Sequence, residues 1–167
     1  VACGYITHAM QASGHRLNIL AVCAVGGSGV SADINGLNFD SQLTNALAYN
    51  ARNLIVMGGI NDAKAGIDPL VVIDAYKKLV TRAVMAGLRV FVCTQPCQDS
   101  SSLTYSVKWQ GAMLAIQQAM RLWCAKQNPM NVILVETAGV YVDPLSPTAN
   151  PKPNYAYASD KLHPSNV

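Results

Sequence analysis

The chain has 167 residues, of which 51% are hydrophobic and 13% are charged, and its formal net charge at pH 7 is +3. This high hydrophobic fraction and low charged fraction exclude an intrinsically disordered chain, and the length suits one domain with its own core. The Lys and Arg residues form no cluster, so the sequence indicates neither nucleic-acid binding nor a membrane surface. No apolar run reaches the roughly 18 residues of a membrane span.

The charged fraction also bears on what surrounds the domain. Globular domains usually contain about 25% charged residues. At 13%, we expect part of the surface to be covered by a partner, by another copy of the chain or by the rest of a longer polypeptide.

Apolar runs alternate with segments of helical period along most of the chain. In chain order we expect a buried strand over Leu17–Val25, a helix over Asn38–Asn50, a strand over Asn53–Met57, a helix over Pro69–Ala86, a strand over Leu88–Thr94, a helix over Leu103–Gln127 and a strand over Val132–Glu136. Residues 137–160 are rich in Pro, Asn, Ser and Tyr and are expected to form a long loop.

This alternation predicts an α/β protein with a parallel sheet flanked by helices, in a single domain over residues 1–167. In such sheets ligands bind outside the carboxyl ends of the strands. Gly-rich or polar segments follow three of the expected strands, at Gly26–Gly29, Gly58–Asp62 and Thr94–Gln98. The sequence therefore predicts the functional site at this edge of the sheet.

The cysteines are odd in number and suggest neither a disulfide framework nor a metal site. Cys23 and Cys124 lie in apolar stretches and are expected to be small core residues. The pair Cys93 and Cys97 lacks the spacing of a redox Cys-x-x-Cys motif, and no second pair completes a zinc site. Free thiols indicate synthesis in a reducing cytosol, which leaves later export or assembly into a particle open.

The turn Gly27–Ala32 has the spacing of a dinucleotide fingerprint. That motif needs an acidic residue about 20 positions further on, at the tip of the next strand. The tip reads Met57-Gly58-Gly59, without an acid. We therefore expect a tight turn there, and a nucleotide-binding flavodoxin-like domain remains an alternative that predicts a phosphate or cofactor at Gly26–Gly29.

Two further segments carry candidate catalytic side chains. In Gly59–Asp62 the glycine permits a sharp turn, and Asn61 offers an amide donor that could stabilise an oxyanion; an ordinary turn or helix cap is equally compatible. In Asp160–Pro164 the aspartate could orient His163 as a general base, or could cap a helix. The other histidines have no acidic neighbour and are expected to be surface or fold-supporting residues.

Together these segments resemble the SGNH, or GDSL-type, hydrolase family. Its G-x-N-D block matches Gly59–Asp62, its D-x-x-H-P block matches Asp160–Pro164, and its small-residue glycine turn matches Ala24–Ser31. The resemblance spans nearly the whole chain and implies a flavodoxin-like three-layer α/β/α sandwich. It also implies an ester hydrolase that needs neither a metal nor an organic cofactor.

The resemblance implies a role for each matching residue. His163 would be the general base and acid, and Asp160 would orient it. Asn61 and the backbone N–H of Gly27 would form the oxyanion hole, with Gly29 as the alternative to Gly27.

The family's nucleophilic serine lies in a Gly-Asp-Ser block, which this sequence lacks. The segment before Leu17 resembles the helix that follows that block, and the family continues into a closing helix beyond the position of Val167. The chain is therefore expected to be truncated at both ends, with the serine upstream. A relative that has lost catalysis is the other explanation. Ser28 could in principle substitute, although it lies in the turn assigned to the oxyanion hole.

Family members often deacetylate carbohydrates, and the low charge and the Tyr-containing loop favour a sugar ester here. Tyr155 and Tyr157 could line a saccharide groove or could be exposed loop residues. We expect a carbohydrate O-acetylesterase acting on acetylated polysaccharide, extracellular or associated with a virion. The alternative is a non-catalytic carbohydrate-binding or structural module, for example in a viral tail fibre or spike.

Overall fold

A computed structural model describes residues 14, 19–31, 38–95 and 107–140. Within these ranges the elements in chain order are α2 (Phe39–Leu47), β1 (Asn53–Val56), α3 (Ile60–Lys64), α4 (Pro69–Met85), β2 (Arg89–Cys93), α5 (Val107–Cys124), β3 (Val132–Val135) and α6 (Thr137–Val140). The three strands and the long helices predicted after residue 38 are therefore present, with ends that differ by a few residues.

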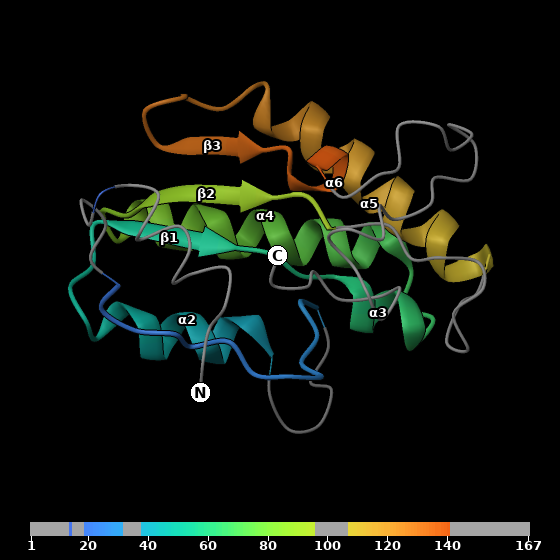
Figure 1. Cartoon of the computed structure of the whole chain (residues 1–167), viewed down its shortest axis with the longest axis horizontal. Helices are drawn as coiled ribbons and strands as arrows, with labels where there is room; N and C mark the ends of the chain where they lie inside the picture. Colours follow the sequence, from blue (N-terminus) through green and yellow to red (C-terminus); the bar gives the residue numbers. More distant parts are fainter. Residues whose placement is uncertain (1–13, 15–18, 32–37, 96–106, 141–167) are drawn as a thin grey trace.

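The strands form one parallel sheet in the order β1-β2-β3. Val56 lies opposite Val92 and Val92 opposite Leu134, so the three strands end at nearly the same level. Figure 1 shows the strand arrows pointing toward one edge, where α3 and α6 follow. The predicted α/β class with a parallel sheet is confirmed.

The core lies between the sheet and the long helices α4 and α5. Val90 and Val92 of β2 are at most 2% exposed, and Val80 of α4 is fully buried. Met113, Ile116 and Met120 of α5 are buried against them, as their helical spacing predicts. The opposite face of the sheet carries Ile55, which is 71% exposed. Among the described elements a helical layer therefore covers one face of the sheet.

Local sequence signals explain where the helices begin and end. Asp68 accepts a hydrogen bond of 2.8 Å from the backbone N–H of Leu70, and Pro69 occupies the first turn of α4. Gly87 follows the helix with a φ of +85°, a conformation that favours glycine. Asn38 and Ser41 form a capping box at the start of α2.

The prediction of a buried strand over Leu17–Val25 is wrong for the residues that the structure describes. Residues 19–25 form no strand, and several of their apolar side chains, including Leu20 and Val22, are about half exposed. A strand needs a neighbour to satisfy its backbone N–H and C=O groups, and none of the described strands pairs with this segment. Cys23 is accordingly only partly buried, whereas Cys124 is buried as predicted.

The expected loop over residues 137–160 is also partly wrong, because Thr137–Val140 form the short helix α6. Thr94, at the end of β2, stabilises its start: the Thr94 Oγ1 accepts a hydrogen bond of 2.8 Å from the Ala138 N–H. The rest of that loop lies outside the described residues.

Candidate active site

The carboxyl end of β1 turns into α3 through two glycines whose lack of a side chain is essential. A Cβ atom on Gly58 would lie 2.2 Å from the ring of Phe39, far inside van der Waals contact. Gly59 has a φ of +111°, which L-residues rarely adopt. The chain therefore passes close against Phe39 of α2 and turns directly into α3, which places Asn61 at the edge of the sheet where β1 ends.

The glycine turn after residue 25 lies beside this point. Gly27 has a φ of +83°, which identifies it, rather than Gly29, as the residue whose backbone conformation requires glycine. Ser28 closes the turn through its backbone N–H and its hydroxyl, both of which donate to the Val25 carbonyl. The side chain of Gln42 in α2 donates to the Ser28 Oγ at 2.7 Å, which fixes the turn to that helix.

Asn61 connects the two segments. Its Nδ2 donates a hydrogen bond of 2.9 Å to the Ser28 carbonyl, so the two candidate oxyanion segments lie in direct contact. An amide nitrogen carries two hydrogens, and the second is available to a ligand. Asn61 is thus oriented by the turn and does not act merely as a helix cap, because the N-cap of α3 is Gly59.

Asp62 makes a second connection that sequence reasoning missed. Its fully buried carboxylate accepts from the N–H of Val30 at 2.7 Å, from the N–H of Ser31 at 2.9 Å and from the Ser31 hydroxyl at 2.6 Å. The available signal is an acidic residue beside the candidate Asn in a Gly-rich turn, a pattern that is also typical of ordinary turns and helix caps.

This arrangement argues against the nucleotide alternative. In a dinucleotide site the backbone N–H groups after the glycines receive a phosphate. Here the N–H groups of Val30 and Ser31 already donate to the carboxylate of Asp62, which would also repel a phosphate. The turn is therefore occupied by an internal anion.

Ser28 is unsuited to be the nucleophile. It is 4% exposed, its Oγ donates to the Val25 carbonyl at 2.5 Å, and the same atom accepts from Gln42. A nucleophilic hydroxyl must reach both the substrate and a general base, and this one is engaged on both sides.

The ends of β2 and β3 form a polar cluster at the same edge. Arg121 of α5 donates twice to Glu136, at 2.6 and 2.9 Å, and Thr94 donates to the same carboxylate at 3.3 Å. The Arg121 hydrogen bond lowers the pKa of Glu136, although partial burial opposes the shift. The Thr137 hydroxyl donates to the Thr94 carbonyl. This cluster fixes α6 at the strand ends.

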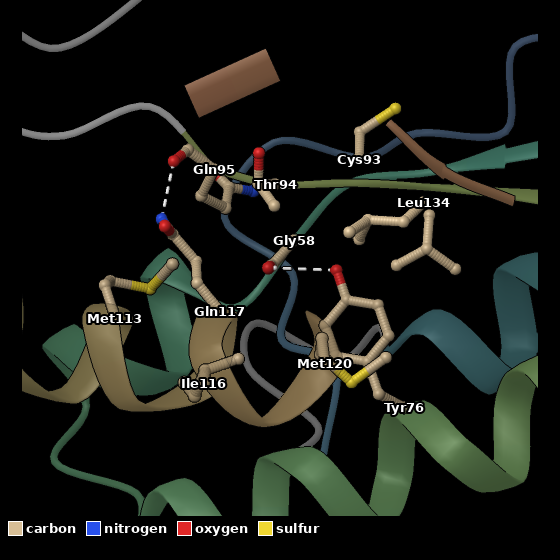
Figure 2. A pocket seen from close by; sticks show the side chains of 11 residues that line it. Gly58, Tyr76, Cys93, Thr94, Gln95, Met113, Ile116, Gln117, Met120 and Leu134 are labelled. Atoms are coloured by element: carbon tan, nitrogen blue, oxygen red, sulfur yellow. Dashed lines mark hydrogen bonds between the residues drawn. The ribbon is translucent and has the colours of Figure 1, made fainter. Parts of the chain in front are cut away.

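A small cavity of about 10 Å³ lies between these strand ends and α5 (Figure 2). It has room for about one water molecule and none for an ester substrate. Its walls are joined by two hydrogen bonds, from the Tyr76 hydroxyl to the Gly58 carbonyl at 3.0 Å and from Gln117 to the Gln95 carbonyl at 2.6 Å. The cavity is a packing feature beneath the site.

The remaining predicted site residues lie outside the described residues. These are His163 and Asp160, the predicted base and its partner, and Tyr155 and Tyr157, the predicted saccharide contacts. Within the described ranges, no group of three or more His, Cys, Asp or Glu side chains could hold a metal ion, and no helix is long and apolar enough to cross a membrane.

Comparison with known proteins agrees with the fold. The family model for GDSL-like lipases and acylhydrolases matches residues 1–167. The chain is also similar to the crystal structure of a protein described as a GDSL-like lipase from Parabacteroides merdae. The TM-score is 0.58 at 16% identity, over 83% of this chain and 62% of the other. Among curated proteins no match was found.

The chain therefore belongs to the GDSL-like lipase/acylhydrolase family. It spans 62% of the length of the similar solved protein.

Proposed function

We propose that the chain forms most of a serine ester hydrolase. The observation that carries this proposal is the hydrogen bond from the Asn61 Nδ2 to the Ser28 carbonyl, which brings the Asn amide to the glycine turn. Donors held in place before the reaction stabilise the negative charge that develops on an ester carbonyl oxygen. Asn61 and the backbone N–H of Gly27 are the donors in this proposal.

In the proposed reaction a serine Oγ attacks the ester carbonyl carbon and transfers its proton to His163, which Asp160 orients. The carbonyl oxygen becomes an oxyanion. Its collapse expels the alcohol, which takes the proton back from His163. Water then attacks the acyl-enzyme with His163 as base, which releases the acid and restores the serine.

The nucleophile in this proposal is a serine that precedes residue 1 in a longer polypeptide. Among the described residues β1 pairs with β2 along one edge only. A parallel strand added beside β1 would end next to Gly58, because parallel strands end at one edge of the sheet. This open position supports an upstream serine at the site.

The proposed substrate is an O-acetylated polysaccharide. The chain's low charge and the tyrosines at positions 155 and 157 support it, because aromatic faces and neutral polar groups suit sugar rings. Tyr155→Ala and Tyr157→Ala should raise KM for acetate release from acetylated polysaccharide and leave hydrolysis of p-nitrophenyl acetate unchanged. Equal effects on both substrates would contradict a saccharide role for these residues.

The catalytic proposal is tested by hydrolysis of p-nitrophenyl acetate by the complete natural polypeptide. His163→Ala should abolish hydrolysis, and Asn61→Ala should lower kcat about 100-fold or more, the typical effect of removing an oxyanion donor. Asn131→Ala is the matched control, because Asn131 is exposed before β3, at the opposite edge of the sheet. A loss below about threefold in Asn61→Ala would reject the oxyanion role.

The absence of Gly-Asp-Ser from the 167 residues favours a second candidate, a non-catalytic carbohydrate-binding or structural module such as one in a viral tail fibre. This module would bind polysaccharide with no hydrolysis of any ester. The residues upstream in the parent gene distinguish the two candidates, because the hydrolase requires a serine there.

A further inference from the structure

Asp62 is fully buried, although it lies next to the half-exposed Asn61. A buried carboxylate is costly unless its oxygens receive hydrogen bonds. Both oxygens do so here: one accepts from the Val30 N–H, and the other accepts from the N–H and the hydroxyl of Ser31. None of the ion pairs among the described residues includes Asp62, so its charge is balanced by these donors.

The three donors belong to the segment that directly follows Gly27–Gly29. Asn61 binds the carbonyl of Ser28 from the same turn of α3. Two adjacent residues of α3 therefore bind the glycine turn at residues 28, 30 and 31. On the other side, Gln42 binds Ser28.

This double attachment determines the position of one oxyanion donor relative to the other. The Gly27 N–H belongs to the turn, and the Asn61 amide belongs to α3. If the turn shifted, the Gly27 N–H would move relative to the Asn61 amide. Hydrogen bonds to an ionised acceptor are about twice as strong as those between neutral groups, which makes a carboxylate an effective clamp.

We propose that Asp62 is the positioning residue of the oxyanion hole: its carboxylate binds residues 30 and 31 and so holds the Gly27 N–H against Asn61. This inference rests on the proposed hydrolase function. Asp62 contacts no substrate in this role and acts entirely through the turn.

The test compares Asp62→Asn with the wild type of the complete polypeptide, using p-nitrophenyl acetate. The amide keeps the shape of the carboxylate, but it replaces one acceptor with a donor that faces N–H groups. We expect kcat to fall about 10- to 100-fold while KM changes less than about twofold, because misplaced donors affect the transition state and not ground-state binding. Asp74→Asn, at an exposed ion pair on α4, is the matched control and should leave both constants unchanged.

A double-mutant cycle separates positioning from general stability. If Asp62 acts through the oxyanion hole, adding Asp62→Asn to Asn61→Ala should cost clearly less than Asp62→Asn alone, because the Asn61 amide with which Asp62 aligns the Gly27 N–H is already gone. Effects that multiply fully would overturn the proposal, since they indicate independent action. An unchanged kcat in folded Asp62→Asn would also overturn it.

Ser31→Ala keeps the test decisive if Asp62→Asn does not fold. It removes one of the three hydrogen bonds to the carboxylate and leaves both backbone bonds in place. We expect a smaller fall in kcat, about three- to tenfold, at unchanged KM. An unchanged kcat would then overturn the positioning role. If Asn61→Ala also has no effect, it is the proposed function that fails; if Asn61→Ala is impaired while Asp62→Asn and Ser31→Ala are not, only the positioning role fails.

Discussion

The side-chain amide of Asn61 donates a 2.9 Å hydrogen bond to the backbone carbonyl of Ser28, which lies 33 positions earlier in the chain. This contact joins the two segments that the family resemblance assigns to an oxyanion hole. It depends on the tight passage at Gly58 and Gly59, and the first three predictions below concern the residues that maintain this edge of the sheet.

Gly58→Ala should destabilise the protein by about 1–3 kcal/mol, because the added methyl group must displace the ring of Phe39. Urea unfolding of the two proteins measures the difference. Gly111→Ala is a control that should stabilise the protein. Its site in α5 is open, and alanine is favoured over glycine in a helix by roughly 0.5–1 kcal/mol. Equal stability of Gly58→Ala and wild type would contradict the close contact.

Tyr76→Phe should cost about 1–3 kcal/mol, because the Gly58 carbonyl would lose its buried donor. The variant should also differ in its response to pH. Burial raises the pKa of Tyr76, so the neutral hydroxyl is favoured in the folded state. This contribution is complete below the ordinary tyrosine pKa of about 10 and is lost as the pH rises above it. Denaturant unfolding between pH 8 and pH 11 should show a steeper loss of stability in wild type than in Tyr76→Phe, and parallel curves would refute the assignment.

Glu136→Gln should lower stability by less than about 1 kcal/mol at neutral pH, because its pair with Arg121 is partly exposed. The Arg121 hydrogen bond holds the pKa of Glu136 below its usual value. The stabilisation is therefore present above the ordinary glutamate pKa of about 4.3 and is lost as the pH falls through the lowered value. The difference between wild type and variant, followed by thermal unfolding, should shrink below pH 4. A difference independent of pH would exclude the ion pair as its source.

The thiol of Cys124 should react slowly with iodoacetamide in the native protein. Burial raises its pKa to about 11, so little of the reactive thiolate is present at pH 8. Mass spectrometry of peptides from native and urea-unfolded protein should show alkylation of Cys124 only after unfolding. Rapid native labelling would contradict the buried position against the core.

The sequence predicted the elements whose signals are local. The apolar stripe of α4 and the β-branched run of β2 each specify their own secondary structure, and the structure confirms both elements. The segment 19–25 shows where such signals fail. An apolar run predicts that its side chains are buried. A strand also needs a neighbouring strand to pair with, and none of the described strands pairs with this segment.

The site divides in the same way. Residue type and position identified Asn61 as a candidate, because an amide donor is a property of a single residue, and the resemblance to the SGNH family added the Gly27 N–H. The partners of Asp62 were decided only by the tertiary structure. The role of a carboxylate depends on which N–H groups surround it. Here those groups belong to a turn more than 30 positions earlier in the chain, and only the packing of α3 against that turn brings them within hydrogen-bond distance of Asp62.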